Sequence, residues 1–196
     1  MIRCWPAFLI FLILTSTAQA HMTVEGAGEI ANGALHPLMT PAHVMILLGL
    51  GLLLGQQLPL DLKTPLRVFA PVSAATLLLT LTGRCPTVYQ PVMIGLVLLI
   101  AIGVALEMKL QRPACRALVA IAAVAIGLDS AVDSGSALTM VKTFVGTWLS
   151  VNAVVFYIAI CASNSAGRQW ARIGIRVLGS WIIAISLLVL AFSLRK

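Results

Sequence analysis

The chain has 196 residues, of which 60% are hydrophobic and only 10% are charged, and its mean hydropathy is +1.04. Soluble domains typically carry about 25% charged residues, so this composition excludes an ordinary soluble domain and predicts an integral membrane protein. The formal charge of +7 does not indicate nucleic-acid binding. The basic residues lie in short clusters between apolar runs and form no patch interleaved with aromatic residues.

The first 20 residues predict a secretory signal peptide. Arg3 is followed by an apolar stretch that is short for a membrane span, and then by Ala18-Gln19-Ala20, a small-residue cleavage pattern. Cleavage after Ala20 would leave His21 as the first residue of the mature chain, offering both an α-amine and an imidazole. The alternative is an uncleaved membrane anchor.

Six apolar runs follow, each close to the roughly 20 residues that a helix needs to cross a bilayer. They are residues 40–58, 66–83, 90–108, 114–131, 139–161 and 173–193. The short connections between them leave no room for a soluble domain. We therefore expect an all-α membrane protein with three parts: a signal peptide at 1–20, a short periplasmic segment at 21–39, and a domain of six transmembrane helices at 40–196.

Lysine and arginine predict the orientation of these spans. The first, third and fifth connections carry eight of them, namely Lys63, Arg67, Lys109, Arg112, Arg116, Arg168, Arg172 and Arg176. The opposite side carries four, namely Arg84, Lys142, Arg195 and Lys196. The positive-inside rule assigns the first set to the cytoplasm. The mature N-terminus and the C-terminus are then both expected outside.

The stretch HPLMTPAH, residues 36–43, carries two of the three histidines at the start of the first apolar run. Thr40-Pro41 predicts a helix N-cap followed by a first-turn proline. His43 is then expected in the first turn, and His36 in a bent lead-in that holds it near His43. A helix N-terminus disfavours an imidazolium, and neutral imidazole is the form that binds metals. The alternative is two interfacial histidines at a membrane surface.

The stretch GLDSAVDSGS, residues 127–136, places two carboxylates at the outer end of the fourth run. Asp129 and Asp133 are four residues apart, so a continuing helix would put both on one face. They repel each other, and a helix C-terminus disfavours them. A bound cation, or Lys142 nearby, would relieve both penalties. The alternative is a solvated periplasmic turn that needs no cation.

These groups are candidate ligands of one metal site at the outer entrance of the protein. The predicted topology places His36, His43, Asp129 and Asp133 on the same side, with His21 on the mature tail above them. Nitrogen and carboxylate ligands suit divalent first-row metals such as Ni, Co, Zn or Mn. Copper would be favoured instead by Met22, Met39, Met45 and Met93, but methionine is also common in membrane cores.

Few other polar groups lie within the runs. Asn152 is in the fifth, where an amide usually bonds to a neighbouring helix, although a role in an ion pathway is the alternative. Glu107 and Lys109 are interpreted as solvated interfacial residues. The sequence has no Ser/His/Asp or Cys/His arrangement, phosphate loop or H-E-x-x-H motif. We therefore expect no enzymatic activity and no prosthetic group.

At these residues the chain resembles the HupE/UreJ family of small bacterial membrane proteins linked to nickel and cobalt uptake. That family has a cleaved signal, six spans and a first-span motif of His-Pro, several residues, then Asp-His. His36, Pro37 and His43 match this motif at the same separation, and the run GLGLLLG follows it. The resemblance implies a multi-pass protein of the bacterial inner membrane with a divalent metal, nickel or cobalt, as its cargo.

The chain departs from the family pattern at both motifs. The family's Asp before the second histidine is Ala42 here, and its motif glycine is Thr40. In the fourth span the family has Phe-His-Gly, one residue, Ala or Val, His-Gly, one residue and Glu. Here Val132 matches, while Asp129 and Asp133 stand where the family has its two histidines. The departures are consistent with a changed metal preference or with loss of transport.

Two functions follow from the residues and the resemblance. The first is inward transport of a divalent metal, with His36 and His43 capturing the ion, Asp129 and Asp133 completing the site, and His21 delivering it. The second is a non-transporting membrane module, either a metal sensor or an assembly partner of a metalloenzyme system. The expected partners are the metal ion and the lipid bilayer, with homo-oligomers or metalloenzyme accessory proteins as further candidates.

Overall fold

A computed structural model describes residues 28–57, 63–82, 88–130 and 136–194. This part of the chain forms seven α-helices, and it contains no strand, which confirms the all-α prediction there. The helices are α2 (Gly28–Met39), α3 (Pro41–Gln56), α4 (Lys63–Thr80), α5 (Gln90–Ala105), α6 (Arg112–Asp129), α7 (Ala137–Ser165) and α8 (Gln169–Leu194). The predicted signal peptide at 1–20 lies outside the described residues.

The last six of these helices coincide with the six predicted apolar runs, but fewer of them reach the length of a membrane span. Within the described ranges, two helices are long and apolar enough to cross a membrane, namely Ala137–Ser165 and Gln169–Ser193. Helices α2 and α3, bent by 78° at their junction, would make a third if they form one span. The 16 residues of α5 rise about 24 Å, less than the roughly 30 Å of bilayer hydrocarbon. The described residues thus contain two to three candidate spans.

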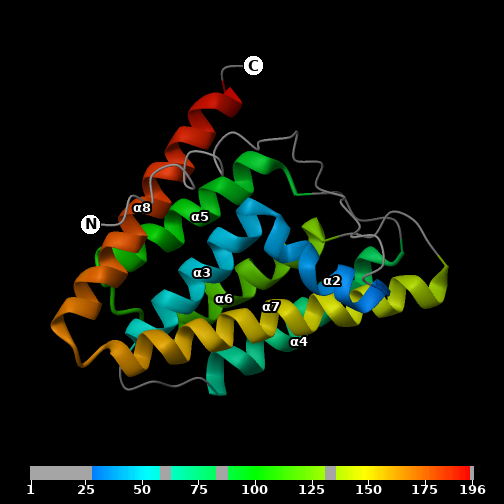
Figure 1. Cartoon of the computed structure of the whole chain (residues 1–196), viewed down its shortest axis with the longest axis horizontal. Helices are drawn as coiled ribbons and strands as arrows, with labels where there is room; N and C mark the ends of the chain where they lie inside the picture. The colour runs from blue at the N-terminus through cyan, green and yellow to red at the C-terminus, as the bar shows by residue number, and fades with distance from the viewer. Residues whose placement is uncertain (1–27, 58–62, 83–87, 131–135, 195–196) are drawn as a thin grey trace, which may run out of the picture.

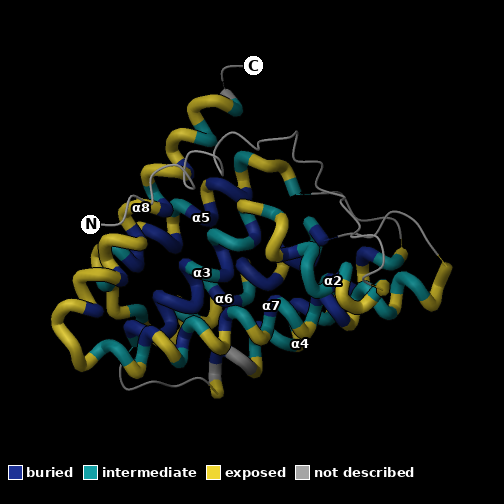
Figure 2. The backbone as a smooth tube through the Cα atoms, viewed as in Figure 1, coloured by how far each residue is buried: buried dark blue, intermediate teal, exposed yellow. Residues whose placement is uncertain are grey.

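Helix α3 occupies the centre of the structure. Helices α7 and α8 diverge from a shared corner, and α3 and α5 lie in the space between them (Figure 1). Helix α4 packs against α6 and α7, and α5 packs against α8. Eleven of the 16 residues of α3 are buried, and the dark blue of its tube in Figure 2 shows this. His43, in the first turn of α3, and Gln56, its last residue, are therefore both inside the protein.

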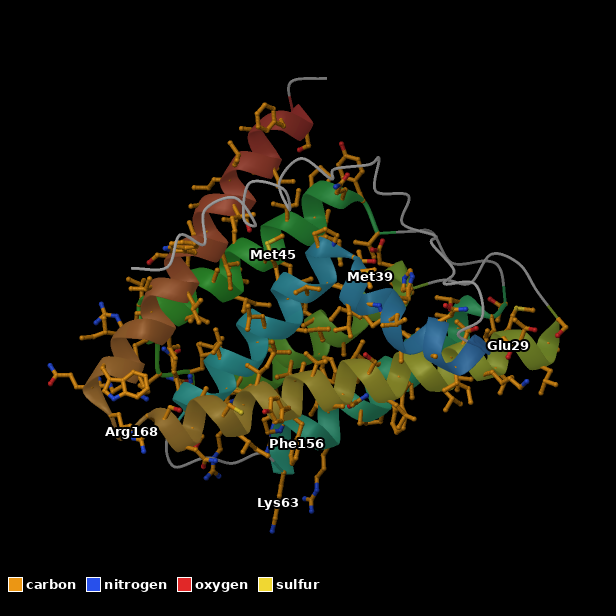
Figure 3. The ribbon with its side chains drawn as sticks, in the orientation of Figure 1. Glu29, Met39, Met45, Lys63, Phe156 and Arg168 are labelled. Atoms are coloured by element: carbon orange, nitrogen blue, oxygen red, sulfur yellow. The ribbon has the colours of Figure 1, made fainter. Side chains whose placement is uncertain are left out.

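The bent lead-in that the sequence predicted before α3 is helix α2, which is bent by 78° relative to α3. It runs along α7, with Glu29 at its start and Met39 at its junction with α3 (Figure 3). Pro37 lies inside this helix and has no N–H for the carbonyl of Gly33, four residues earlier. The hydroxyl of Thr147 on α7 donates to that carbonyl instead, at 2.9 Å. Packing against α7 thus compensates for a proline that local propensity would place outside a helix.

Substituting Gly146 by alanine is expected to destabilise the protein by roughly 1–3 kcal/mol, the usual range for overpacking. A Cβ at this position of α7 would lie 2.0 Å from the backbone oxygen of Ile30 and 2.9 Å from the backbone nitrogen of Ala34. These are backbone atoms of α2, so only a shift of the whole helix relieves the clash. The measurement is the thermal unfolding midpoint in detergent.

The matched control for this substitution is Gly174→Ala. Gly174 lies in α8, and a Cβ there would meet no atom within 4 Å. Alanine should leave the midpoint unchanged or raise it, because alanine is the better helix former by about 1 kcal/mol. Equal midpoints for the two variants would contradict the tight crossing of α2 and α7.

Candidate metal centre

The junction of α2 and α3 is held by a hydrogen bond from one helix to the other. Thr40 is the N-cap of α3 and Pro41 its first residue, as the sequence predicted. The Thr40 side chain makes no capping bond within α3. Its hydroxyl donates instead to the backbone carbonyl of His36 on α2, at 3.1 Å. This bond fixes the end of α2 relative to the first turn of α3, where His43 lies.

His43 is paired with Asp129 in the protein interior. The Nε2 atom of His43 lies 2.9 Å from Oδ2 of Asp129, and the two residues are 86 positions apart in the chain. The His43 side chain has no exposed surface, whereas the Asp129 side chain is 25% exposed. Asp129 ends α6, where the helix dipole disfavours a carboxylate. The hydrogen bond from the imidazole offsets this penalty.

This pairing determines which nitrogen of His43 is available to a metal. When Nε2–H donates to the carboxylate, the neutral imidazole carries its lone pair on Nδ1. Nδ1 is buried and has no hydrogen-bond partner among the described residues. Histidines that bind metals commonly donate their second N–H to a carboxylate in this way. The geometry thus leaves Nδ1 of His43 as the nitrogen with an unused lone pair and places the Asp129 carboxylate behind the ring.

His36 brings a second imidazole to the same place. The ring centres of His36 and His43 are 5.9 Å apart, and the rings meet edge to face at 67°. An imidazole nitrogen binds a metal at about 2.1 Å, which puts the ring centre roughly 3 Å from the ion. Two ring centres about 6 Å apart can therefore share one ion. The spacing fits a pair of imidazole ligands.

The described residues supply only part of the predicted ligand set. The structure brings His36, His43 and Asp129 together, as the sequence predicted, while His21 and Asp133 lie outside the described residues. In the described ranges, no group of three or more His, Cys, Asp or Glu side chains is arranged to hold a metal ion. The two imidazoles and the carboxylate behind one of them are thus the described core of the candidate site.

Lys142 has a different partner from the one the sequence suggested. Its Nζ lies 3.5 Å from Oε2 of Glu29, which joins α7 to the start of α2. Relief of the unfavourable position of Asp129 comes from His43 instead. The sequence could not show that α2 packs against α7 and brings Glu29 to Lys142.

A second polar cluster lies at the Gln56 end of α3, where Lys109 is exposed, in agreement with its interpretation as solvated, and Glu107 is half-buried. Arg172 of α8 donates two hydrogen bonds to the Glu107 carboxylate, at 3.0 and 3.1 Å. These bonds hold the pKa of the Glu107 carboxyl below its usual range. Lys109 donates to the backbone oxygen of Gln56. Together they join the C-terminal ends of α3 and α5 to α8 around a cavity of about 230 Å³.

The described residues define an all-helical protein with candidate membrane spans and a buried histidine, His43, which is backed by a carboxylate and lies beside a half-buried second histidine. The model of the family described as HupE / UreJ protein matches residues 9–189, so the chain belongs to the HupE/UreJ family. This confirms the resemblance found in the sequence. Neither the comparison with curated proteins nor the comparison with solved structures finds a match.

Proposed function

We propose that this protein is a permease that carries a divalent transition metal, of the nickel or cobalt type, inward across the bacterial inner membrane. The family is associated with nickel and cobalt uptake or with accessory roles. The proposal includes six spans with both mature termini in the periplasm, and no enzymatic step. The observation that supports it is the His43–Asp129 pair beside His36, since a carboxylate hydrogen-bonded to a histidine is the arrangement that metal-binding histidines commonly have.

The residues of this site favour binding of a divalent cation through their ligand type and their charge. Divalent cations of the nickel type prefer imidazole nitrogen among the side chains available here. The ion must lose part of its hydration shell to enter a buried site, and the Asp129 charge behind His43 offsets part of that loss. His21 and Asp133 are proposed as further ligands that accept the ion first or complete its coordination.

The test is metal accumulation in cells that express the wild type, His43→Ala or Asp129→Ala, grown with nickel or cobalt. The wild type is expected to accumulate metal above the empty-vector level, and both variants are expected to fall to that level. Gln90→Ala serves as the control, because Gln90 is an exposed residue at the start of α5. Equal accumulation in the wild type and both site variants would remove this mechanism.

One observation favours the second function, a metal sensor or an assembly partner of a metalloenzyme system. The buried residues of α3 between His43 and Gln56 are all apolar or glycine, so this helix offers an ion no polar route inward. Titration of the purified protein with Ni, Co, Zn, Mn and Cu separates the functions when it is combined with the accumulation assay. Binding without accumulation supports the sensor or assembly role, and binding with accumulation supports transport.

A further inference from the structure

A third polar cluster lies deeper in the bundle, where α4, α6 and α7 meet. Asn152 is near the middle of α7, and its Nδ2 lies 3.5 Å from the hydroxyl oxygen of Ser73 on α4. Thr76, one turn further along α4, has its hydroxyl oxygen 3.4 Å from the backbone carbonyl of Ala123 on α6. Ser73 is completely buried. The sequence pointed to Asn152 alone, and packing adds the two hydroxyls.

This cluster lies on a line that leads inward from Asp129. Gly127, two residues before Asp129, packs so closely on Thr76 that a Cβ would lie 1.9 Å from its hydroxyl oxygen. Ala123 is six residues before Asp129 on the same helix, about 9 Å along its axis. Thr76 therefore lies against α6 at Gly127 and Ala123, within about two helical turns of Asp129.

The oxygen atoms of the cluster can accept more hydrogen bonds than the described residues donate to them. The hydroxyls of Ser73 and Thr76 donate their protons to carbonyls of their own helix, at 3.1 and 2.9 Å, so each oxygen keeps acceptor capacity, of which Asn152 Nδ2 uses one part at Ser73. The Oδ1 atom of Asn152 is buried and accepts no hydrogen bond from any described residue. Buried polar atoms normally have partners, so an acceptor-rich cluster points to a ligand that is a cation or a donor of protons.

A role in holding α7 against α4 does not by itself explain the side-chain amide of Asn152. The shortest bond of Asn152 runs to the carbonyl of Trp148 in its own helix, at 2.8 Å, whereas its contact with Ser73 is 3.5 Å. The indole of Trp148 already bonds α7 to α4, through the carbonyl of Ala70 at 2.9 Å. The adhesive bond between these helices is thus made one turn away from Asn152.

We propose that Asn152, Ser73 and Thr76 form a second, inner station for the transported divalent cation, which arrives with part of its water shell. This inference rests on the proposed transport function. Amide and hydroxyl oxygens are neutral, hard ligands, so they hold a hydrated cation more weakly than imidazoles do. Conduction needs sites that bind an ion and then release it. A weak inner station after a stronger outer one meets this requirement.

The first test compares Asn152→Leu with Trp148→Phe in proteoliposomes loaded from outside with cobalt. Leucine removes the Oδ1 acceptor, so a cation that passes this position loses one oxygen partner and gains no replacement. We expect initial cobalt uptake to slow roughly tenfold or more. Cobalt affinity at the outer site should change less than about twofold, because distant sites are nearly independent. Trp148→Phe removes the bond between α7 and α4 but leaves the station, so its uptake should stay close to that of the wild type.

The second test is a cobalt titration of purified Asn152→Asp. A carboxylate at this position converts a weak station into a strong one, so the variant should bind one more equivalent of cobalt than the wild type. Wild-type uptake by Asn152→Leu, or no additional equivalent in Asn152→Asp, overturns the inner station while the outer site stands. Absence of uptake in the wild type overturns the proposed transport instead, and the titration still decides whether the station binds metal.

Discussion

Asp129→Asn is expected to weaken nickel or cobalt binding by roughly 10–100-fold, the usual effect of removing a carboxylate that orients a histidine ligand. Asparagine has nearly the same shape but carries no charge, and its amide either donates or accepts. An amide that donates to Nε2 of His43 forces the imidazole proton onto Nδ1, the nitrogen that the ion needs. The measurement is the dissociation constant of the purified protein from a calorimetric titration.

A double-mutant cycle shows whether Asp129 orients His43 or binds the ion itself. Where Asp129 acts through His43, Asp129→Asn should add little to the loss already caused by His43→Ala, because residues that share one interaction are not additive. Additive losses would show that Asp129 binds the ion independently, which is the role that the sequence assigned to it. The unfolding midpoints of all three variants separate a loss of affinity from a loss of fold.

The sequence identified which residues meet at this site but not how they meet. Hydropathy and charge placed the ends of the first and fourth runs on the same side, and His43 and Asp129 are indeed in contact there. The contact itself depends on the lateral packing of α3 against α6, which periodicity does not encode. The sequence alone therefore could not distinguish a direct His43–Asp129 hydrogen bond from two side chains that bind one shared ion.

Helix α2 is an element whose helical conformation local propensity does not predict. The sequence GEIANGALHPLM contains two glycines and a proline, which are the poorest helix formers, so local propensity predicts no helix. Of these two glycines, Gly33 lets α2 approach the backbone of α7 at Thr143, and Gly146 of α7 does the same for the backbone of α2 at Ile30. Tertiary packing is what stabilises this helix, as it does most short helices, and a single sequence does not reveal its partner.

The inner station was missed for a third reason. Serine and threonine hydroxyls in apolar helices usually bond to their own backbone, so Ser73 and Thr76 are unremarkable in the sequence. Their proposed role depends on Asn152, which is 79 positions away from Ser73 in the chain. Only the packing of α4 shows that Ser73 lies against Asn152 of α7 and Thr76 against Ala123 of α6.

Ala42→Asp should tighten cobalt binding by roughly tenfold, about the effect of one well-placed ligand contact. Ala42 is the partly buried second residue of α3, directly before His43. It occupies the position at which the family motif has an aspartate. A helix N-terminus favours a carboxylate there, so the new charge adds an anionic group beside the imidazoles without unfolding α3. Ala42→Asn is the control, since it adds the same bulk without the charge.

The combined variant Ala42→Asp/Asp129→Asn tests whether Asp129 has taken over from the acid that this chain lacks. With Asp129 present, His43 already has a carboxylate at 2.9 Å, so a second one has less to contribute. In the Asp129→Asn background, Ala42→Asp should restore most of the lost affinity, and its effect there should exceed its effect in the wild type. Equal effects in the two backgrounds would mean that the two acids act independently, and the aspartate of α6 would then be an addition to the site instead of a replacement.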